Sequence, residues 1–186
     1  AVFCGSLAEL QLEHYIEHQR EKRFVKQLAN DLKADATNLA YFLEVQDKRR
    51  LRIDSLLSIF ANDEQSTKGD ETYFHTRRII RPGEYLPSDG TITQLKFGAN
   101  LRLIRPIGLA DSIISYDRQS RQLVEILDLI NETNFRFTER LRPLFDAKVF
   151  NAMLGTNNEI NQPIGNPQLI TKDKILLNEF FMELQF

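Results

Sequence analysis

The most constraining feature of this sequence is a long N-terminal run that contains neither glycine nor proline. It extends from Leu7 to Ala61, so no residue in it breaks a helix or supplies a ready turn. Its apolar residues recur three and four positions apart: Val25, Leu28, Leu32, Leu39, Phe42, Ile53, Leu56 and Phe60. This spacing predicts one continuous helix over residues 7–61 with an almost coiled-coil stripe, although Thr37 and Asn38 could cap a new start.

A second segment gives the strongest periodic signal in the chain. Together with the polar Ser120 and Asn134, its apolar residues occupy ten positions that alternate three and four apart: Ile113, Tyr116, Leu123, Leu127, Ile130, Phe137, Leu141 and Leu144. Pro106 suits the first turn of a helix, whereas Pro143 removes a backbone donor and should kink or restart the helix. The pattern predicts a long helix over residues 106–154 that is kinked near Pro143.

Polar residues interrupt both stripes. Asp35, Gln46 and Arg49 fall in the register of the first stripe, and Ser120 and Asn134 fall in that of the second. A polar side chain at a seam position can set the register of the packed helices, or it can line a small polar pocket. We favour a register-setting contact for Ser120 and Asn134, and both readings remain open.

The remaining segments are shorter. Residues 62–90 are predicted to form a loop region, and within it the secondary structure of residues 72–80 is left undecided by the sequence. Residues 91–97 read as a short helix, and residues 171–186 read as a final helix with Thr171 as its cap.

Two long helices with apolar stripes should bury those stripes together. Each buried Leu, Ile or Phe contributes roughly 1.5–3 kcal/mol to stability. The sequence therefore predicts a single all-α domain over residues 1–186. We expect an elongated antiparallel helical bundle built on two long heptad-patterned helices, with the short helices covering the groove.

Composition limits the function classes. The net charge of −2 argues against nucleic-acid binding, which needs a basic face to displace counterions. Local basic clusters read as solvated helix faces or as partners of nearby acids: Arg49, Arg50 and Arg52, and Arg77, Arg78 and Arg81. A single cysteine, Cys4, allows no internal disulfide. Residues 1–12 are mildly apolar and could be the end of a membrane anchor.

One segment spells a possible metal motif. His14, Glu17 and His18 form the order H-x-x-E-H, in which two imidazoles on one helical face can share a zinc ion beside a carboxylate base. No third ligand stands out, and the neighbouring residues resemble a solvated helix surface. We therefore expect no catalytic residue, no bound metal and no cofactor, and we keep a metal-dependent hydrolase only as a remote alternative.

Two segments resemble a known family. The block Thr91–Ile104, followed by Leu109–Tyr116, and the charged stretch Glu17–Leu39 are similar to a family of uncharacterised single-pass inner-membrane proteins of Bacteroidota. The resemblance implies an N-terminal membrane anchor before Ala1, a helical domain on the periplasmic side of the bacterial inner membrane, and a final helix that continues. The family has no known activity, so the resemblance assigns no catalytic residue.

Two functions are compatible with these observations. The favoured hypothesis is a membrane-tethered, non-enzymatic domain that binds a protein partner or forms a homo-oligomer through its heptad stripes. The alternative is a periplasmic sensor of a small ligand, with a pocket near Ser120, Asn134 and the segment that contains Tyr73 and Tyr85.

Overall fold

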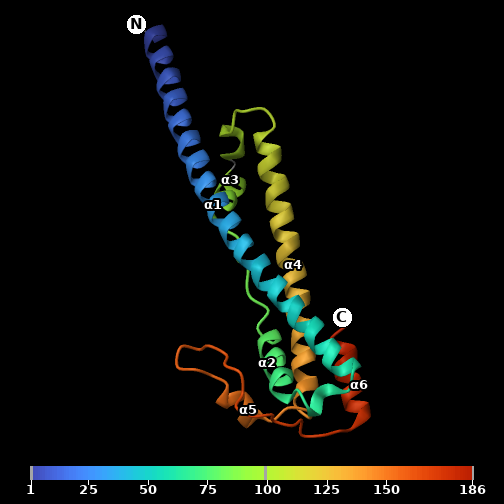
Figure 1. Ribbon diagram of the computed structural model, residues 1–186. Helices are drawn as coiled ribbons and strands as arrows, with labels where there is room; N and C mark the ends of the chain where they lie inside the picture. Colours follow the sequence, from blue (N-terminus) through green and yellow to red (C-terminus); the bar gives the residue numbers. More distant parts are fainter. Residues whose placement is uncertain (1, 99, 186) are drawn as a thin grey trace. The chain divides into compact units, whose positions relative to one another are not determined.

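Every regular element in the described part of the chain is a helix (Figure 1). The computed structural model describes the backbone of residues 2–98 and 100–185, and the side chains of residues 9–98, 100–102 and 104–185. The helices are α1 (Val2–Ala61), η1 (Glu64–Ser66), α2 (Gly69–Ile79), α3 (Gly90–Phe97), η2 (Asn100–Leu103), α4 (Leu109–Leu141), α5 (Ala147–Ala152) and α6 (Lys174–Glu183). The prediction of an all-α fold with two long helices is confirmed.

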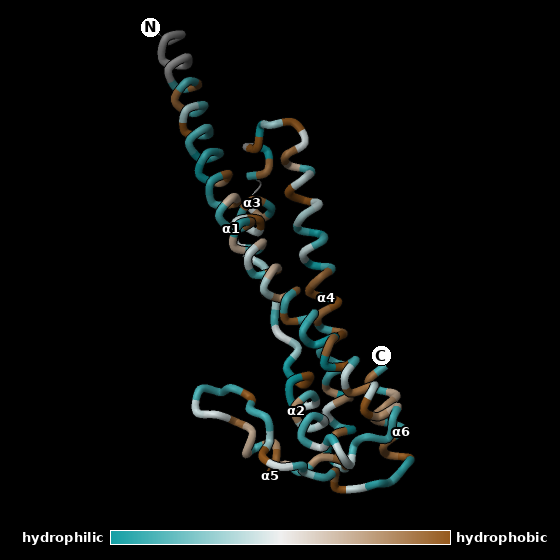
Figure 2. Tube along the Cα trace, in the orientation of Figure 1, coloured by the Kyte–Doolittle hydropathy of each residue, from teal (hydrophilic) through white to brown (hydrophobic). Residues whose placement is uncertain are grey.

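The contacts divide the chain into two units, and each has its own core. The first unit combines α1 up to Tyr41 with Tyr85–Ile126, and the second combines Phe42–Glu84 with the chain from Leu127 onward. Along both α1 and α4, hydrophobic residues recur between hydrophilic ones (Figure 2), as expected for helices that bury one side.

The core of the first unit is small. Its buried apolar residues come from α1, α3, the segment after η2, and α4: Leu28, Ile92, Leu95, Ile104 and Ile113. Two buried carboxylates lie on the same side of α1 as Leu28. Glu21 accepts a hydrogen bond from the backbone N–H of Arg105 at 3.0 Å, and Asp35 accepts one from the N–H of Ser88 at 2.7 Å.

Within the first unit, α1 and α4 run in the same direction, so the prediction of an antiparallel pair is wrong. Glu21 contacts Arg105, just before α4, and Asp35 contacts Tyr116, inside it. The contacts therefore advance along both helices together. The reason is the connection between them. Ser88 contacts Asp35 and Leu95 packs with Leu28, so the connection itself runs back along α1 before α4 begins.

The core of the second unit is larger and rich in aromatic rings. Phe180 of α6 lies 5.0 Å from Phe60, 5.4 Å from Phe137 and 5.6 Å from Phe145, measured between ring centroids. The side chain of Asp173 caps α6 by accepting from the N–H groups of Ile175 and Leu176. The final helix therefore begins at Lys174 and not at Thr171, because the carboxylate of Asp173 satisfies its first amides.

Two predicted boundaries need correction in the second unit. The expected loop over residues 62–90 contains α2, whose buried face includes Thr72 and Thr76, both fully buried. These threonines hide the helical pattern from a count of apolar residues. The helix predicted over residues 106–154 ends at Leu141, because Pro143 stops the hydrogen-bond ladder and Asp146 then caps the separate helix α5.

No helix among the described residues has the length and hydrophobicity that crossing a bilayer demands. Within the segment 1–12, expected to be the end of a membrane anchor, the structure describes the backbone alone for residues 2–8, and both backbone and side chains for residues 9–12. The side chain of Cys4 lies outside the described residues, so the statement about its pairing stays a prediction.

Candidate functional site

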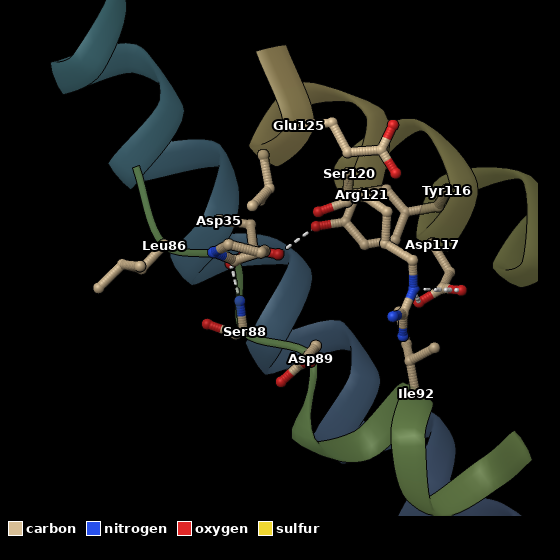
Figure 3. Close-up of a pocket in the computed structure, with 12 residues that line it drawn as sticks. Asp35, Leu86, Ser88, Asp89, Ile92, Tyr116, Asp117, Ser120, Arg121 and Glu125 are labelled. Atoms are coloured by element: carbon tan, nitrogen blue, oxygen red, sulfur yellow. Dashed lines mark hydrogen bonds and ion pairs between the residues drawn. The ribbon is translucent and has the colours of Figure 1, made fainter. Parts of the chain in front are cut away.

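A pocket of about 440 Å³ lies in the first unit between α1, the segment before α3, and α4 (Figure 3). Its walls are partly apolar, and half of its polar side chains are acidic. The polar side chains are Asp35, Ser88, Asp89, Tyr116, Asp117, Ser120, Arg121 and Glu125, and the apolar ones are Leu86, Pro87, Ile92 and Val124.

Asp35 forms one wall of this pocket and is only 3% exposed. Besides the amide of Ser88, it accepts a hydrogen bond from the hydroxyl of Tyr116. Burial raises the pKa of Tyr116 well above its usual range, and the neighbouring Asp35 carboxylate raises it further. Tyr116 therefore stays protonated and serves as a fixed donor, so Asp35 is a buried acceptor with two partners already in place.

Asp117 forms the opposite wall and carries two cationic partners. Lys96 of α3 donates to it at 2.6 Å, and Arg121 donates from the next turn of α4 at 3.1 Å. Burial by itself would raise the pKa of Asp117, but the hydrogen bonds from Arg121 and Lys96 outweigh it and lower that pKa. The contact with Lys96 ties α3 to α4, and the two cations together offset the charge of Asp117.

Ser120 is the one predicted site residue whose polar group lines this pocket without a partner. Its hydroxyl oxygen is buried and makes no hydrogen bond to any described residue. A buried hydroxyl without a partner costs roughly 1–3 kcal/mol, and a bound molecule in the pocket would remove that cost. Of the two interpretations of Ser120, this position therefore favours a side chain that lines a ligand pocket over one that sets the register of packed helices.

Asn134 lies in the second unit, and its contacts favour the other interpretation, a side chain that sets the register of packed helices. Its side-chain amide donates to the carbonyl of Ile80 at 2.9 Å, and its side-chain oxygen accepts from Arg49 at 3.2 Å. It thereby links α4 to α1 and to the end of α2 at one defined register. Arg49, which interrupts the apolar stripe of α1, thus has Asn134 as its hydrogen-bond partner.

The two predicted tyrosines are both buried and lie in different units. The hydroxyl of Tyr73 accepts from the amide of Asp146 at 2.8 Å and donates to the carbonyl of Gln168 at 3.2 Å, inside the second core. Tyr85 is buried in the first unit. Ser120 and Tyr85 belong to the first unit, and Asn134 and Tyr73 belong to the second, so a pocket near all four residues stays a prediction.

The H-x-x-E-H segment is organised around a cation from its own chain. The guanidinium of Arg105 lies 3.1 Å from Nε2 of His14 and 3.7 Å from the carboxylate of Glu17. His18 points to Glu21, at 3.3 Å. Among the described residues, no group of three or more histidine, cysteine, aspartate or glutamate side chains could hold a metal ion.

A second feature of the first unit is an apolar stripe on the surface of α1, here called the outer stripe, in which the first four residues are exposed and the last is half-buried: Val25, Ala29, Leu32, Ala36 and Leu39. Val25 is 36% exposed and Leu32 is 38% exposed. Both were expected in the packed seam. The stripe read from the sequence is in fact two adjacent stripes, because Leu28 and Asp35 face the core while the outer stripe lies beside them. Three exposed lysines border the outer stripe: Lys22, Lys26 and Lys33.

The chain matches no known family model, no curated protein and no solved structure.

Proposed function

We propose that this chain is a non-catalytic interaction domain that binds an acidic, amphipathic helix of a partner protein through the outer stripe. The main supporting observation is that Val25, Leu32 and Leu39 repeat every seven residues, and yet Val25 and Leu32 remain exposed and Leu39 is only half-buried. Heptad-spaced apolar side chains are the pattern by which one helix binds another.

The side chains of the outer stripe fit a closely packed helix. Ala29 and Ala36 alternate with the larger Val25 and Leu32, and small residues allow a second backbone to come near. The lysine border decides the kind of partner. An acidic helix meets it with opposite charge, whereas a second copy of the chain brings the same lysines. We therefore propose a different protein in preference to a homo-oligomer.

The proposal includes a location. The resemblance to single-pass inner-membrane proteins supports an N-terminal anchor that precedes this chain, with the helical domain on the periplasmic side of the bacterial inner membrane. A domain tethered to a membrane meets partners held at the same membrane at a raised effective concentration. Even a modest affinity therefore yields a populated complex.

The test uses a photo-crosslinking amino acid placed at Leu32 in cells, with Asn30 as the control position. Asn30 is exposed on the same helix but points away from the outer stripe. We expect a single adduct of defined mass from position 32 and none from position 30. The variants Lys26→Glu and Lys33→Glu should lower the yield of this adduct, because they reverse the charge of lysines that border the outer stripe. Equal labelling at both positions, or an adduct that contains only a second copy of this chain, would contradict the proposal.

A second candidate function is the binding of a small ligand by the pocket of the first unit. It is favoured by the unpartnered hydroxyl of Ser120, and the acidic side chains of Asp89 and Glu125 suit an organic cation with an apolar body. A thermal-shift screen with amines tests it. Val124→Trp, which fills the pocket, should abolish any shift, whereas the exposed variant Gln122→Trp should not. A shift that survives Val124→Trp would remove this candidate.

A further inference from the structure

Two basic clusters of the sequence meet in the second unit. Arg52 of α1, Arg78 of α2 and Arg81 just after α2 line one pocket of about 450 Å³ together with residues 158–161. The sequence favoured solvated faces or pairing with nearby acids. None of the ion pairs among the described residues includes any of these three arginines. Three cationic side chains therefore converge beside a single acid, Glu159, with which none of them forms an ion pair.

The pocket holds two of these arginines in place through neutral groups. Arg78 donates to the carbonyl of Ile160 at 3.0 Å, and its guanidinium lies 4.6 Å from the centroid of the Phe74 ring. Arg81 donates to the carbonyl and the side-chain oxygen of Asn158, at 3.3 and 3.2 Å. Each contact fixes the direction of a guanidinium and leaves its full positive charge in the pocket.

The third arginine faces the other two from α1. Arg52 makes no hydrogen bond or ion pair with a described residue, and it is only partly exposed. Burial lowers its pKa, and the positive charge of Arg78 lowers it further. The two guanidiniums therefore repel each other across the pocket. An anion between them would turn this repulsion into attraction.

We propose that Arg52, Arg78 and Arg81 form a binding site for an oxyanion, a phosphate or a phosphomonoester group. Planar guanidiniums donate paired hydrogen bonds to phosphate oxygens, and charge-assisted bonds of this kind are about twice as strong as neutral ones. Glu159 also lines the pocket, and its negative charge weakens the site. The ligand is either a soluble phosphate compound or the headgroup of an anionic lipid.

This site stands apart from the proposed interaction function. The outer stripe belongs to the first unit and the arginines belong to the second. A variant at Leu32 leaves the arginines unchanged, and a variant at Arg52 leaves the outer stripe unchanged, so failure of one proposal says nothing against the other.

Isothermal titration of the full chain with inorganic phosphate tests the site. The test compares wild type with Arg52→Gln and with the control Arg50→Gln, which removes an exposed arginine from the same helix. We expect saturable one-to-one binding that Arg52→Gln weakens about tenfold, since loss of one charge-assisted contact is worth roughly 1.4 kcal/mol or more. Arg50→Gln should change the affinity less than about twofold. Glu159→Gln should tighten binding because it removes the acid.

Vesicles distinguish the two sources of the anion. If phosphatidic acid in phosphatidylcholine vesicles competes with phosphate, and pure phosphatidylcholine does not, the site takes a lipid headgroup. If neither vesicle competes, it takes a soluble phosphate compound. Absence of saturable binding to both phosphate and anionic vesicles overturns the proposal, as does an equal loss of affinity in Arg50→Gln and Arg52→Gln. Circular dichroism of each variant checks that the helices are retained.

Discussion

The two units of this molecule are stabilised by different kinds of contact. In the second unit Phe180 is fully buried among Phe60, Phe137 and Phe145. In the first unit α1 instead directs two buried carboxylates, Glu21 and Asp35, toward backbone amides of the returning segment. One core rests on apolar burial, and the other depends on directional hydrogen bonds around a few apolar side chains.

This difference has consequences for function. Apolar burial has no preferred direction and hardly changes between pH 4 and pH 8. A buried carboxylate fixes one partner at one register, and it loses its advantage when it takes up a proton. The unit with the smaller core is also the one that carries the outer stripe and the pocket beside Ser120. Regions that bind partners are commonly those of lower local stability.

The largest expected effect comes from the aromatic core. Phe180→Ala should lower the free energy of unfolding by roughly 3–5 kcal/mol, because it removes a fully buried ring and leaves a cavity. Ile175→Ala, an exposed position on the same helix, should change it by less than about 0.5 kcal/mol. Urea unfolding followed by circular dichroism measures both. Similar midpoints for the two variants would mean that the second core is not the main source of stability.

Asp35→Ala should have the next largest effect and should act mainly on the first unit. It leaves the amide of Ser88 and the hydroxyl of Tyr116 without their acceptor, at a cost of about 1–3 kcal/mol. Hydrogen exchange should increase in residues 85–126 and change little in residues 142–185. Adding Tyr116→Phe to Asp35→Ala should recover part of the loss, because it removes one unsatisfied donor. Uniform acceleration along the whole chain would show that the two cores unfold together.

Acid should affect the first unit more than the second. The amide of Arg105 lowers the pKa of Glu21 against the effect of burial, and His18 adds to this. The hydrogen bonds from Arg121 and Lys96 lower the pKa of Asp117. Both folded-state pKa values lie below the unfolded values of about 4.3 and 3.9. The stabilisation is therefore present above those values and is lost as pH falls through the folded pKa values.

Hydrogen exchange at pH 6 and at pH 3 measures this effect. Protection in residues 85–126 should decrease more than protection in residues 142–185. Glu21→Gln should make the first unit less sensitive to acid, since that side chain can no longer take up a proton. A larger loss of protection in residues 142–185 than in residues 85–126 would contradict the prediction that acid affects the first unit more.

The smallest predicted effect concerns His75 in the second unit. Burial lowers its pKa, and the nearby charges of Arg52 and Arg78 lower it further, against the opposing effect of Glu71. The neutral form is favoured in the folded state, so its stabilisation is present above the unfolded pKa of about 6.5 and declines as pH falls below it. Thermal unfolding at pH 7.5 and at pH 5.5 should show a slight loss that His75→Gln abolishes.

Much of the helical content followed from the spacing of apolar residues. The long helices α1 and α4 were predicted because their periodicity persists over many turns without glycine or proline. The polar interruptions at Asp35 and Arg49 were also visible, although their partners Tyr116 and Asn134 were not, because those partners are distant in sequence. Helix α2 was missed because buried threonines carry much of its packed face.

The sequence by itself determined that this protein is helical, where its two long helices lie and which polar residues interrupt their packed faces, because these features follow from the 3.6-residue repeat of a single helix. Only the tertiary structure decided that α1 and α4 run in the same direction, that Val25 and Leu32 stay on the surface, and that Arg52 meets Arg78 and Arg81. These outcomes depend on the path of the connecting segments and on which side of each helix they cover, and periodicity within one helix carries no information about either.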